Sequence, residues 1–531
     1  MMNYKQQSVK PEHFAMVSDP EIPRSRFDTD QTYKTTFDSG YLVPVYIDEV
    51  LPGDDFQLDM TAFTRLTTPL YPVMDNMYLE SFFFFVPNRL VWDNWRKMMG
   101  EQTNPGDSTD FTVPQITSPT NGYLVNSLED YFGLPTVGQL TAGNTVTHSA
   151  MWQRAYNLIY NEWFRDENLQ NSVTVNKDNG PESFTNFTLL RRGKRKDYFT
   201  SCLPWPQKGN AATLPLGTAA QIKFTPSGVS TSTTGAINSA TGALWGLTTG
   251  VLNTTSYFTS GVATPVSPMY ADLSTATAAT INQLRTSFAV QRLLERDSRG
   301  GTRYTEIIRS HFGVTSPDAR LQRPEYLGGG TTPVNFNPIA QTSGTAATGA
   351  PLGTLGAMAV SLAHGHKFRS AFVEHGMIIG LVSVRADLSY QQGLHKMFSR
   401  KTRYDYYFPA FAHLGEQAVL NKEIYITGNS TSDDAVFGYQ ERWAEYRYKP
   451  SRITGLFRST ASGTLDGWHL SQKFTSLPTL NSTFISDTPP VDRILAVSSS
   501  IGKQFYFDAY FTVRMSRPLP MYSVPGLIDH F

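Results

Sequence analysis

The segment at residues 505–515 restricts the fold more than any other part of this sequence. Phe505, Phe507, Ala509, Phe511, Val513 and Met515 are apolar, and Tyr506, Asp508, Tyr510, Thr512 and Arg514 alternate with them. Because successive side chains of a β-strand point to opposite faces of a sheet, this spacing predicts a strand with one face on a core. Residues 56–60 alternate in the same way. Such strands have to bury one face of their sheet against a second layer.

A third strand is predicted at residues 77–86, which end in the five apolar residues FFFFV. Both faces of that end should be covered, and we expect neighbouring subunits to cover the outside. Apolar residues at helical spacing, followed in most cases by glycine, predict four helices. These helices lie at residues 90–99, 149–163, 280–298 and 304–312. The pattern favours one elaborated antiparallel sandwich over three independent domains.

Composition excludes several classes of protein. The 531 residues include 45 basic and 45 acidic side chains, and this balance excludes a histone-like polycation. Aromatic residues make up 13%, which is too many for a disordered chain. The single cysteine, Cys202, excludes an intramolecular disulfide. No apolar run reaches the roughly 18 residues of a membrane span, and the N-terminus lacks a secretory signal. We therefore expect a soluble protein that is made inside the cell and does not insert into a membrane.

Three segments differ from the rest in composition. Residues 1–39 are polar and rich in turns, and we interpret them as an extended N-terminal arm before one domain at residues 40–531. Residues 209–280 contain only two charged side chains. A flexible linker is one interpretation of this segment. We favour a β-rich insertion that orders against its symmetry mates, because uncharged copies can crowd around an axis without repulsion. Residues 327–366 carry no charge and are predicted to form an extended loop and a strand at an interface.

The sequence predicts no catalytic, cofactor or metal site. It contains no G-x-S-x-G elbow and no phosphate-binding loop. Cys202 lies between apolar residues and prolines, which favours a buried, inert thiol. The histidines nearest to a metal cluster lack a carboxylate or cysteine at ligand spacing; they are His364, His366 and His375. A calcium ion between subunits is a hypothesis without EF-hand spacing to support it, and its candidate ligands are Asp54, Asp55 and Asp59.

Residues 191–196 form the densest positive run of the chain. Its basic residues are Arg191, Arg192, Lys194, Arg195 and Lys196, and the rings of Tyr198 and Phe199 follow. Cations for phosphates beside rings for base stacking favour single-stranded nucleic acid. A solvated loop or an ion-pair site between subunits explains the run equally well. Two further basic regions with interleaved tyrosines lie at residues 396–407 and 442–458.

Long segments spread over most of the chain carry a resemblance to a known family. They are residues 34–54 (KTTFDSGYLVPVYIDEVLPGD), 74–78 (MDNMY), 82–92 (FFFFVPNRLVW), 192–208 (RGKRKDYFTSCLPWPQK), 438–450 (GYQERWAEYRYKP) and 525–531 (PGLIDHF). In these segments the chain resembles the major capsid proteins of gokushoviruses, which are small single-stranded DNA bacteriophages of the microvirus family. The resemblance fades between residues 209 and 280.

The resemblance implies a mainly β fold, an eight-stranded antiparallel jelly-roll sandwich with large insertions between strands that contain helices and loops. It implies a structural subunit, not an enzyme, that assembles through five-, three- and two-fold contacts into a T=1 icosahedral capsid. Such a capsid has sixty copies around circular single-stranded DNA. A protrusion at each three-fold axis is also implied, and the uncharged segment at 209–280 fits it by position. The candidates for host recognition in this segment are Phe224, Trp245, Tyr257 and Phe258.

The balanced charge has a consequence for packaging. A chain with zero net charge cannot neutralise a genome with its own excess cations, so we expect a separate basic protein inside the shell. The resemblance implies a small basic internal DNA-binding protein in this role. Further expected partners are other copies of the chain, the packaged single-stranded DNA and a host-cell surface receptor. The expected location is the virion, and the host cytoplasm before assembly.

Two other functions fit parts of the sequence. A carbohydrate-active β-sandwich enzyme would need paired carboxylates in an aromatic cleft, and no spacing in the sequence pairs them. A trimeric β-rich adhesin would suit the uncharged segment at 209–280. The absence of internal sequence repeats counts against an adhesin.

Overall fold

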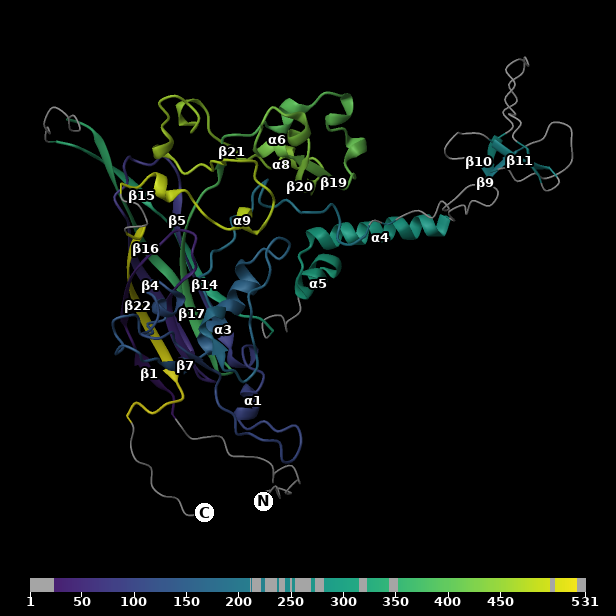
Figure 1. The fold of residues 1–531 in the computed structure, drawn as a ribbon. Coiled ribbons are helices and arrows are strands. Elements are labelled where there is room, and N and C mark those ends of the chain that lie inside the picture. The colour runs from purple at the N-terminus through teal and green to yellow at the C-terminus, as the bar shows by residue number, and fades with distance from the viewer. Residues whose placement is uncertain are drawn as a thin grey trace, which may run out of the picture. The chain divides into compact units, whose positions relative to one another are not determined.

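The computed structural model describes residues 23–210, 212, 221–224, 236–237, 244–248, 251–253, 269–272, 281–314, 322–342, 352–496 and 502–522. Between residues 221 and 272 the description covers the backbone alone. The chain divides into two compact units (Figure 1). The larger unit combines Met1–Pro206 with Thr302–Phe531, and the smaller unit is Gln207–Gly301.

One large sheet dominates the larger unit (Figure 1). Its strands are β1 (Ser25–Asp28), β2 (Gln31–Phe37), β3 (Val43–Val50), β4 (Asp55–Leu66), β5 (Met77–Pro87), β14 (Glu325–Pro333), β15 (Asn335–Ala340), β16 (Leu355–Ala371), β17 (Gly376–Ala386) and β22 (Phe505–Arg517). Their order is β1-β22-β4-β16-β14-β5-β17-β3, and β2 and β15 pair with β22 and β16. All of these pairings are antiparallel. Since β2 continues β1 along β22, and β15 continues β14 along β16, the ten strands fill eight positions.

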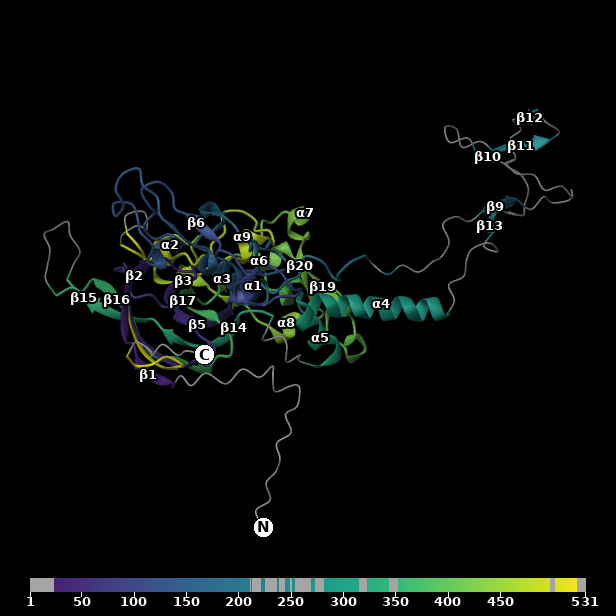
Figure 2. The same cartoon turned by 90° about the horizontal axis from the view of Figure 1, so that it is seen from below.

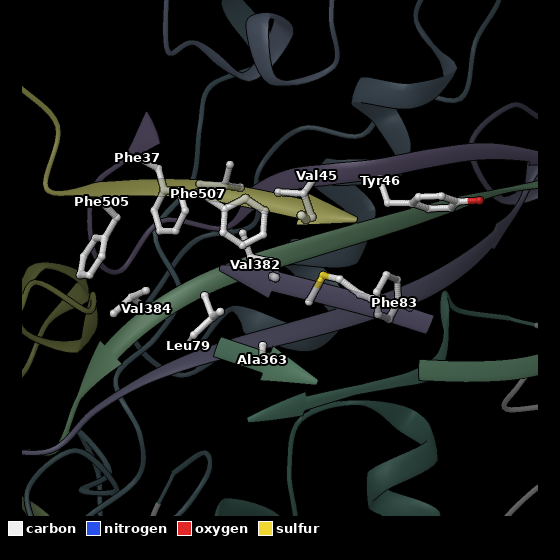
Figure 3. Packing of buried hydrophobic residues seen from close by; sticks show 14 of the residues in the cluster. Phe37, Val45, Tyr46, Leu79, Phe83, Ala363, Val382, Val384, Phe505 and Phe507 are labelled. Carbon is white, nitrogen blue, oxygen red and sulfur yellow. The ribbon is translucent and has the colours of Figure 1, made fainter. Parts of the chain in front are cut away.

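The two ends of this sheet fold toward each other. Tyr46 lies on β3 and Phe511 on β22, near opposite ends of the strand order, yet their ring centroids are only 5.1 Å apart. A core of buried side chains from β2, β3, β4, β5, β16, β17 and β22 fills the space between the two halves. Figure 3 shows this packing, with Phe37, Val382 and Phe507 coming from three different strands. The predicted mainly β sandwich is therefore confirmed.

The strand predicted at 505–515 is present as β22. Buried and more exposed residues alternate along it as far as Met515, as the sequence pattern requires. The neighbouring β4, which contains the strand predicted at 56–60, alternates in the same way. β22 pairs with β4 on one side and with β1 and β2 on the other. Residues 23–39 of the expected N-terminal arm therefore contain two strands of the main sheet.

β5 and β17 are covered on both faces. Every residue of β17 is buried, and nine of the eleven residues of β5 are buried. The outer cover comes from helix α3 (Met151–Ile159) of the same chain, which packs against β17 (Figures 1 and 2). The expectation that neighbouring subunits cover this face was therefore wrong. The apolar run needed a second layer, and a long insertion within the chain supplies it.

The predicted helices differ in how completely they form. Helix α3 continues as a π-helical turn through Phe164, α4 spans Ile281–Arg299 and α5 spans Tyr304–Phe312. α5 ends at Gly313, whose φ of 70° is left-handed and favours glycine. The helix predicted at 90–99 was mostly wrong, because only α1 (Trp95–Met98) forms there. The amide of Asp93 donates instead to the carbonyl of Lys177, which interrupts the helical pattern.

The uncharged residues 327–366 contribute more strand than the sequence predicted. Most of those that the structure describes lie in three strands of the main sheet, β14, β15 and β16. The predicted extended loop falls partly on residues 343–351, which lie outside the described residues. Along β16 buried residues alternate with more exposed ones, so one face of this segment belongs to the sandwich core.

Shorter elements form the loops of the larger unit. The strands are β6 (Gln115–Thr117), β7 (Thr147–Ser149), β8 (Glu182–Ser183), β18 (Ser389–Tyr390), β19 (Glu416–Leu420), β20 (Val436–Glu441) and β21 (Ser451–Arg452). The helices are α2 (Leu128–Tyr131), α6 (Asn421–Ile424), α7 (Ser430–Asp433), α8 (Ala444–Arg447) and α9 (Ser482–Ile485). A separate apolar cluster around Tyr198, Phe199 and Val419 packs β19, β20 and α6 together.

The smaller unit contains α4 and five short strands. The strands are β9 (Gln221–Phe224), β10 (Ala236–Ile237), β11 (Leu244–Thr248), β12 (Val251–Asn253) and β13 (Met269–Asp272). β10, β11 and β12 form one antiparallel sheet, and β9 pairs with β13. Within the described part of both units, every helix is too short or too polar to span a lipid bilayer.

Candidate nucleic-acid and assembly surfaces

The basic run at 191–196 lies against the main sheet and is held there by hydrogen bonds. The Arg191 guanidinium donates to the carbonyls of Ser39 and Asp487, each at 3.0 Å. It also stacks 3.9 Å from the ring centroid of Tyr41. The Arg191 side chain therefore joins the segment before β3 to the loop after α9.

Arg192 belongs to a charged cluster on the sheet. Its guanidinium and that of Arg385 both donate to the carboxylate of Glu80 on β5, and Arg385 also pairs with Asp387. Burial raises the pKa of Glu80, but the two guanidinium groups outweigh it and hold the pKa below its usual value. Such a cluster leaves Arg192 little freedom to bind a phosphate.

Two members of the predicted DNA-binding patch lie in the interior. Lys194 is buried over the ring of Phe484, and burial lowers the pKa of its amine to about 8. Tyr198 is only 4% exposed, and its hydroxyl donates to Glu423 at 2.8 Å. Neither side chain is open to a nucleic acid in this structure. The high charge of this segment predicted that it lies on the surface. The carboxylates that its side chains contact, Glu80, Asp166 and Glu423, belong to other segments, so the segment alone does not reveal them.

The other two members are more accessible. Arg195 is exposed, and Lys196 pairs with Asp166 while keeping its side chain more than half exposed. For these two residues, contact with packaged DNA stays a prediction. The run at 191–196 thus serves mainly to connect separate parts of the fold.

Asp487, in the loop after α9, makes the stability of the folded protein depend on pH. Burial raises the pKa of Asp487 to about 6, against the attraction of Arg192, Lys194 and Arg191. An aspartate in an unfolded chain has a pKa of about 3.9. The unfolded chain therefore loses this proton first as the pH rises, and stability falls between about pH 4 and pH 6.

Replacing Asp487 with asparagine is expected to remove this part of the pH dependence. Relative to D487N, the natural protein should lose about 2 kcal/mol of unfolding free energy between pH 4 and pH 7. Urea denaturation of both proteins across this range measures the difference. If the unfolding free energies of the two proteins changed equally with pH, the prediction would be contradicted.

Arginine side chains pair with the acidic residues for which a calcium ion was proposed. Arg517 pairs with Asp54 at 3.1 Å and lies 3.8 Å from Asp48, and Arg369 pairs with Asp55 at 3.1 Å. Among the described residues, no group of three or more histidine, cysteine, aspartate or glutamate side chains is arranged to hold a metal ion. The inter-subunit calcium ion stays a hypothesis.

The histidines and the cysteine have structural surroundings. The His366 ring lies between the hydroxyls of Ser81 and Thr332, at 2.7 and 2.8 Å. Cys202 is buried beneath the apolar cluster of β19 and β20, and burial raises the pKa of its thiol. A thiol in this state is a poor nucleophile, as the sequence predicted.

The outer face of β15, β16, β4 and β22 carries large apolar side chains. Phe63 on β4 is 46% exposed and lies opposite Leu362 of β16, which is 54% exposed. Others on this face are Ile339, Met358, Tyr506 and Tyr510. Contiguous exposed apolar surface is typical of protein–protein contacts. We call this set of residues the outer sheet face.

The candidates for host recognition are only partly described. Phe224 is the last residue of β9 and Trp245 lies in β11, both within the smaller unit. Tyr257 and Phe258 lie outside the described residues. Their role in recognition stays a prediction.

Comparison with known proteins identifies the family. A phage capsid protein family, described as "Capsid protein (F protein)", matches residues 15–527. The chain belongs to this capsid protein family. Among similar proteins, capsid protein VP1 of Bdellovibrio phage phiMH2K is 46% identical, and the match covers 98% of each chain. Capsid protein VP1 of Chlamydia phage 1 is 45% identical over 98% of each chain, and that of Spiroplasma virus 4 is 35% identical over 97%.

These findings confirm the resemblance to gokushovirus capsid proteins. The chain is a structural capsid subunit of a small phage, it assembles with other copies into a shell, and it is a component of the virion. It is not an enzyme. The carbohydrate-active enzyme and the adhesin are therefore set aside as functions of this capsid protein.

Proposed function

We propose that this capsid protein forms a T=1 shell of sixty copies around circular single-stranded DNA. The near-complete match to three phage capsid proteins is the observation that carries the proposal. The outer sheet face supports it, because it leaves apolar surface for contacts between copies. In a closed shell each weak contact is repeated by symmetry, so modest contacts suffice for a stable assembly.

Packaging needs positive charge that this chain does not supply in excess. With 45 basic and 45 acidic residues, sixty copies bring no net charge to the genome. A small basic internal protein would neutralise the phosphates, helped by basic patches of the capsid protein. Protein analysis of purified particles tests this partner. Particles that hold DNA without another cationic protein or a polyamine would exclude it.

The smaller unit at Gln207–Gly301 supports the proposed surface protrusion and attachment to a receptor. It is compact by itself and contains the segment at 209–280, for which we proposed a three-fold insertion. Among the residues of this unit that the structure describes, none belongs to a strand of the main sheet. A unit with its own sheets can vary or be removed without breaking the core of the shell.

Deleting residues 215–275 is therefore expected to leave shell formation intact and to abolish adsorption to host cells. Adsorption would fall by at least tenfold, while electron microscopy would still show closed particles. A matched variant with a short glycine–serine linker of the same end-to-end reach controls for strain at the junction. Loss of shells in both variants would show that the segment is a structural contact.

The shell itself is tested by imaging. Cryo-electron microscopy of particles from expressed capsid protein should show closed icosahedral shells with sixty subunits. Open sheets, isolated trimers or larger shells would contradict the proposed T=1 architecture. Nuclease-protected circular single-stranded DNA in particles from infected cells is the second expected result.

A further inference from the structure

Two basic regions that are separate in sequence meet on one surface of the larger unit. They are residues 396–408 and 442–458, and the Arg400 guanidinium joins them. It donates to Glu445 at 3.1 Å and stacks 4.4 Å from the ring centroid of Tyr446. Tyr407 also lies 5.6 Å, between ring centroids, from Trp443. We call these two segments together the aromatic–basic surface.

The rings of the aromatic–basic surface face solvent. Each of six rings is at least 46% exposed, namely Phe398, Tyr404, Tyr406, Tyr407, Tyr446 and Tyr448. Burying such rings in the core would gain far more free energy than leaving them in water. Contacts with cations hold several of them in place, since Arg400 stacks on Tyr406 and Tyr446. The surface is therefore a set of preordered, accessible ring faces.

The same surface concentrates positive charge. Its two segments contain nine basic and two acidic residues, whereas the whole chain is balanced at 45 of each. Both acids are engaged, because Asp405 accepts from the amides of Lys401 and Thr402, and Glu445 accepts from Arg400. Within the described residues, Lys401, Arg403, Lys449 and Arg452 have no ion pair. These four cations are free to contact an anion.

A cleft borders the aromatic–basic surface. Its lining includes Lys396, Phe398, Tyr448, Arg452 and Arg458. Cations and two rings that are at least half exposed thus line a concave site next to the open surface, and the two carboxylates that also line it, Glu423 and Glu445, are paired with Lys396 and Arg400. Phosphates and a flat aromatic group are the chemistry that fits both features.

We propose that the aromatic–basic surface binds single-stranded DNA by stacking bases on its tyrosines and pairing phosphates with its unpaired cations. A duplex hides its base faces, so exposed rings favour a single strand. An acidic protein segment would use the cations but not the ring faces. The proposal deepens the proposed function, because it rests on the packaging of single-stranded DNA and places a contact with it on residues other than 191–196.

Fluorescence anisotropy of the full-length protein with a labelled oligothymidylate tests the proposal. The double variant Tyr404→Ala/Tyr448→Ala is expected to bind at least tenfold more weakly, with an unchanged salt dependence. The variant Arg403→Gln/Arg452→Gln should lower the slope of log affinity against log salt by about 1.4, because each phosphate contact contributes about 0.7. Tyr404→Phe/Tyr448→Phe keeps the rings and should restore binding.

A matched control lies on the outer sheet face. Tyr506→Ala/Arg514→Gln removes a similarly exposed ring and a cation from β22 and should leave DNA binding unchanged. Equal weakening by this control, or equal binding of duplex DNA, would overturn the proposal. Variants that still form DNA-filled shells but bind oligothymidylate like the natural protein would overturn it and leave the proposed function standing. Shells of the natural protein from infected cells that hold no circular single-stranded DNA would instead overturn the proposed function.

Discussion

Replacing Arg154 with methionine is expected to lower the free energy of unfolding by about 3 to 5 kcal/mol. Arg154 lies on α3 and its side chain is fully buried. Its guanidinium pairs with Glu182 and Asp178 and donates to the carbonyl of Val91 at 3.0 Å. Without the guanidinium, the Glu182 carboxylate would be left buried and unpaired. The loss would loosen the layer that covers β5 and β17.

The double variant Arg154→Met/Glu182→Met tests this explanation. Replacing both partners removes the unpaired charge, so the double variant should be markedly more stable than Arg154→Met alone. Arg26→Met is the control for an exposed pair, because Arg26 and Asp28 are both more than half exposed. Urea denaturation of the three variants measures the changes in stability. A shift of the midpoint at an unchanged slope of free energy against urea reports each change. A double variant as unstable as Arg154→Met would show that packing volume, not the unpaired charge, causes the loss.

Replacing Phe511 with alanine is expected to cost a similar amount, about 3 to 5 kcal/mol. The Phe511 side chain is fully buried in the sandwich core, and it packs against Tyr46 where the two ends of the sheet meet. A cavity there would weaken the contact that closes the sheet on itself. We therefore expect reduced yield of folded subunit and of closed shells.

Tyr506→Ala is the matched control for Phe511→Ala. It removes a ring from the same strand, but from the face that points away from the core. The isolated subunit should lose no more than about 0.5 kcal/mol in unfolding free energy. Subunit denaturation and shell yield are measured for both variants. If Tyr506→Ala destabilised the isolated subunit as much as Phe511→Ala, the outer sheet face would have to be covered within the chain.

Local sequence patterns predicted the regular elements well where the burial of one face decides the structure. The alternation at 505–515 became β22, and the apolar stripe after residue 149 became α3. The helix predicted at 90–99 failed because Asp93 finds a backbone partner at Lys177, far along the chain. Periodicity describes one segment at a time, so a competing long-range hydrogen bond leaves no trace in it.

The candidate site was predicted less well than the fold. The charge of residues 191–196 suggested a surface, but Glu80 from β5 and Asp166 after α3 pair with Arg192 and Lys196. The rings and cations at 396–407 and 442–458 were visible in the sequence as two separate regions. Only their meeting through Arg400 makes them one surface. The density of charge in a segment does not show whether its basic side chains bind other side chains of the protein or a ligand.

The sequence by itself determined that this chain is a mainly β capsid subunit, because the pattern of its strands and its long family-like segments are both local properties. The tertiary structure alone decided which cations are engaged, which ring faces are open and which layer covers β5 and β17. The physical reason is that ion pairs, the burial of side chains and the packing of one layer on another depend on residues hundreds of positions apart. Such neighbours are set by the folding of the sheet and not by any stretch of residues.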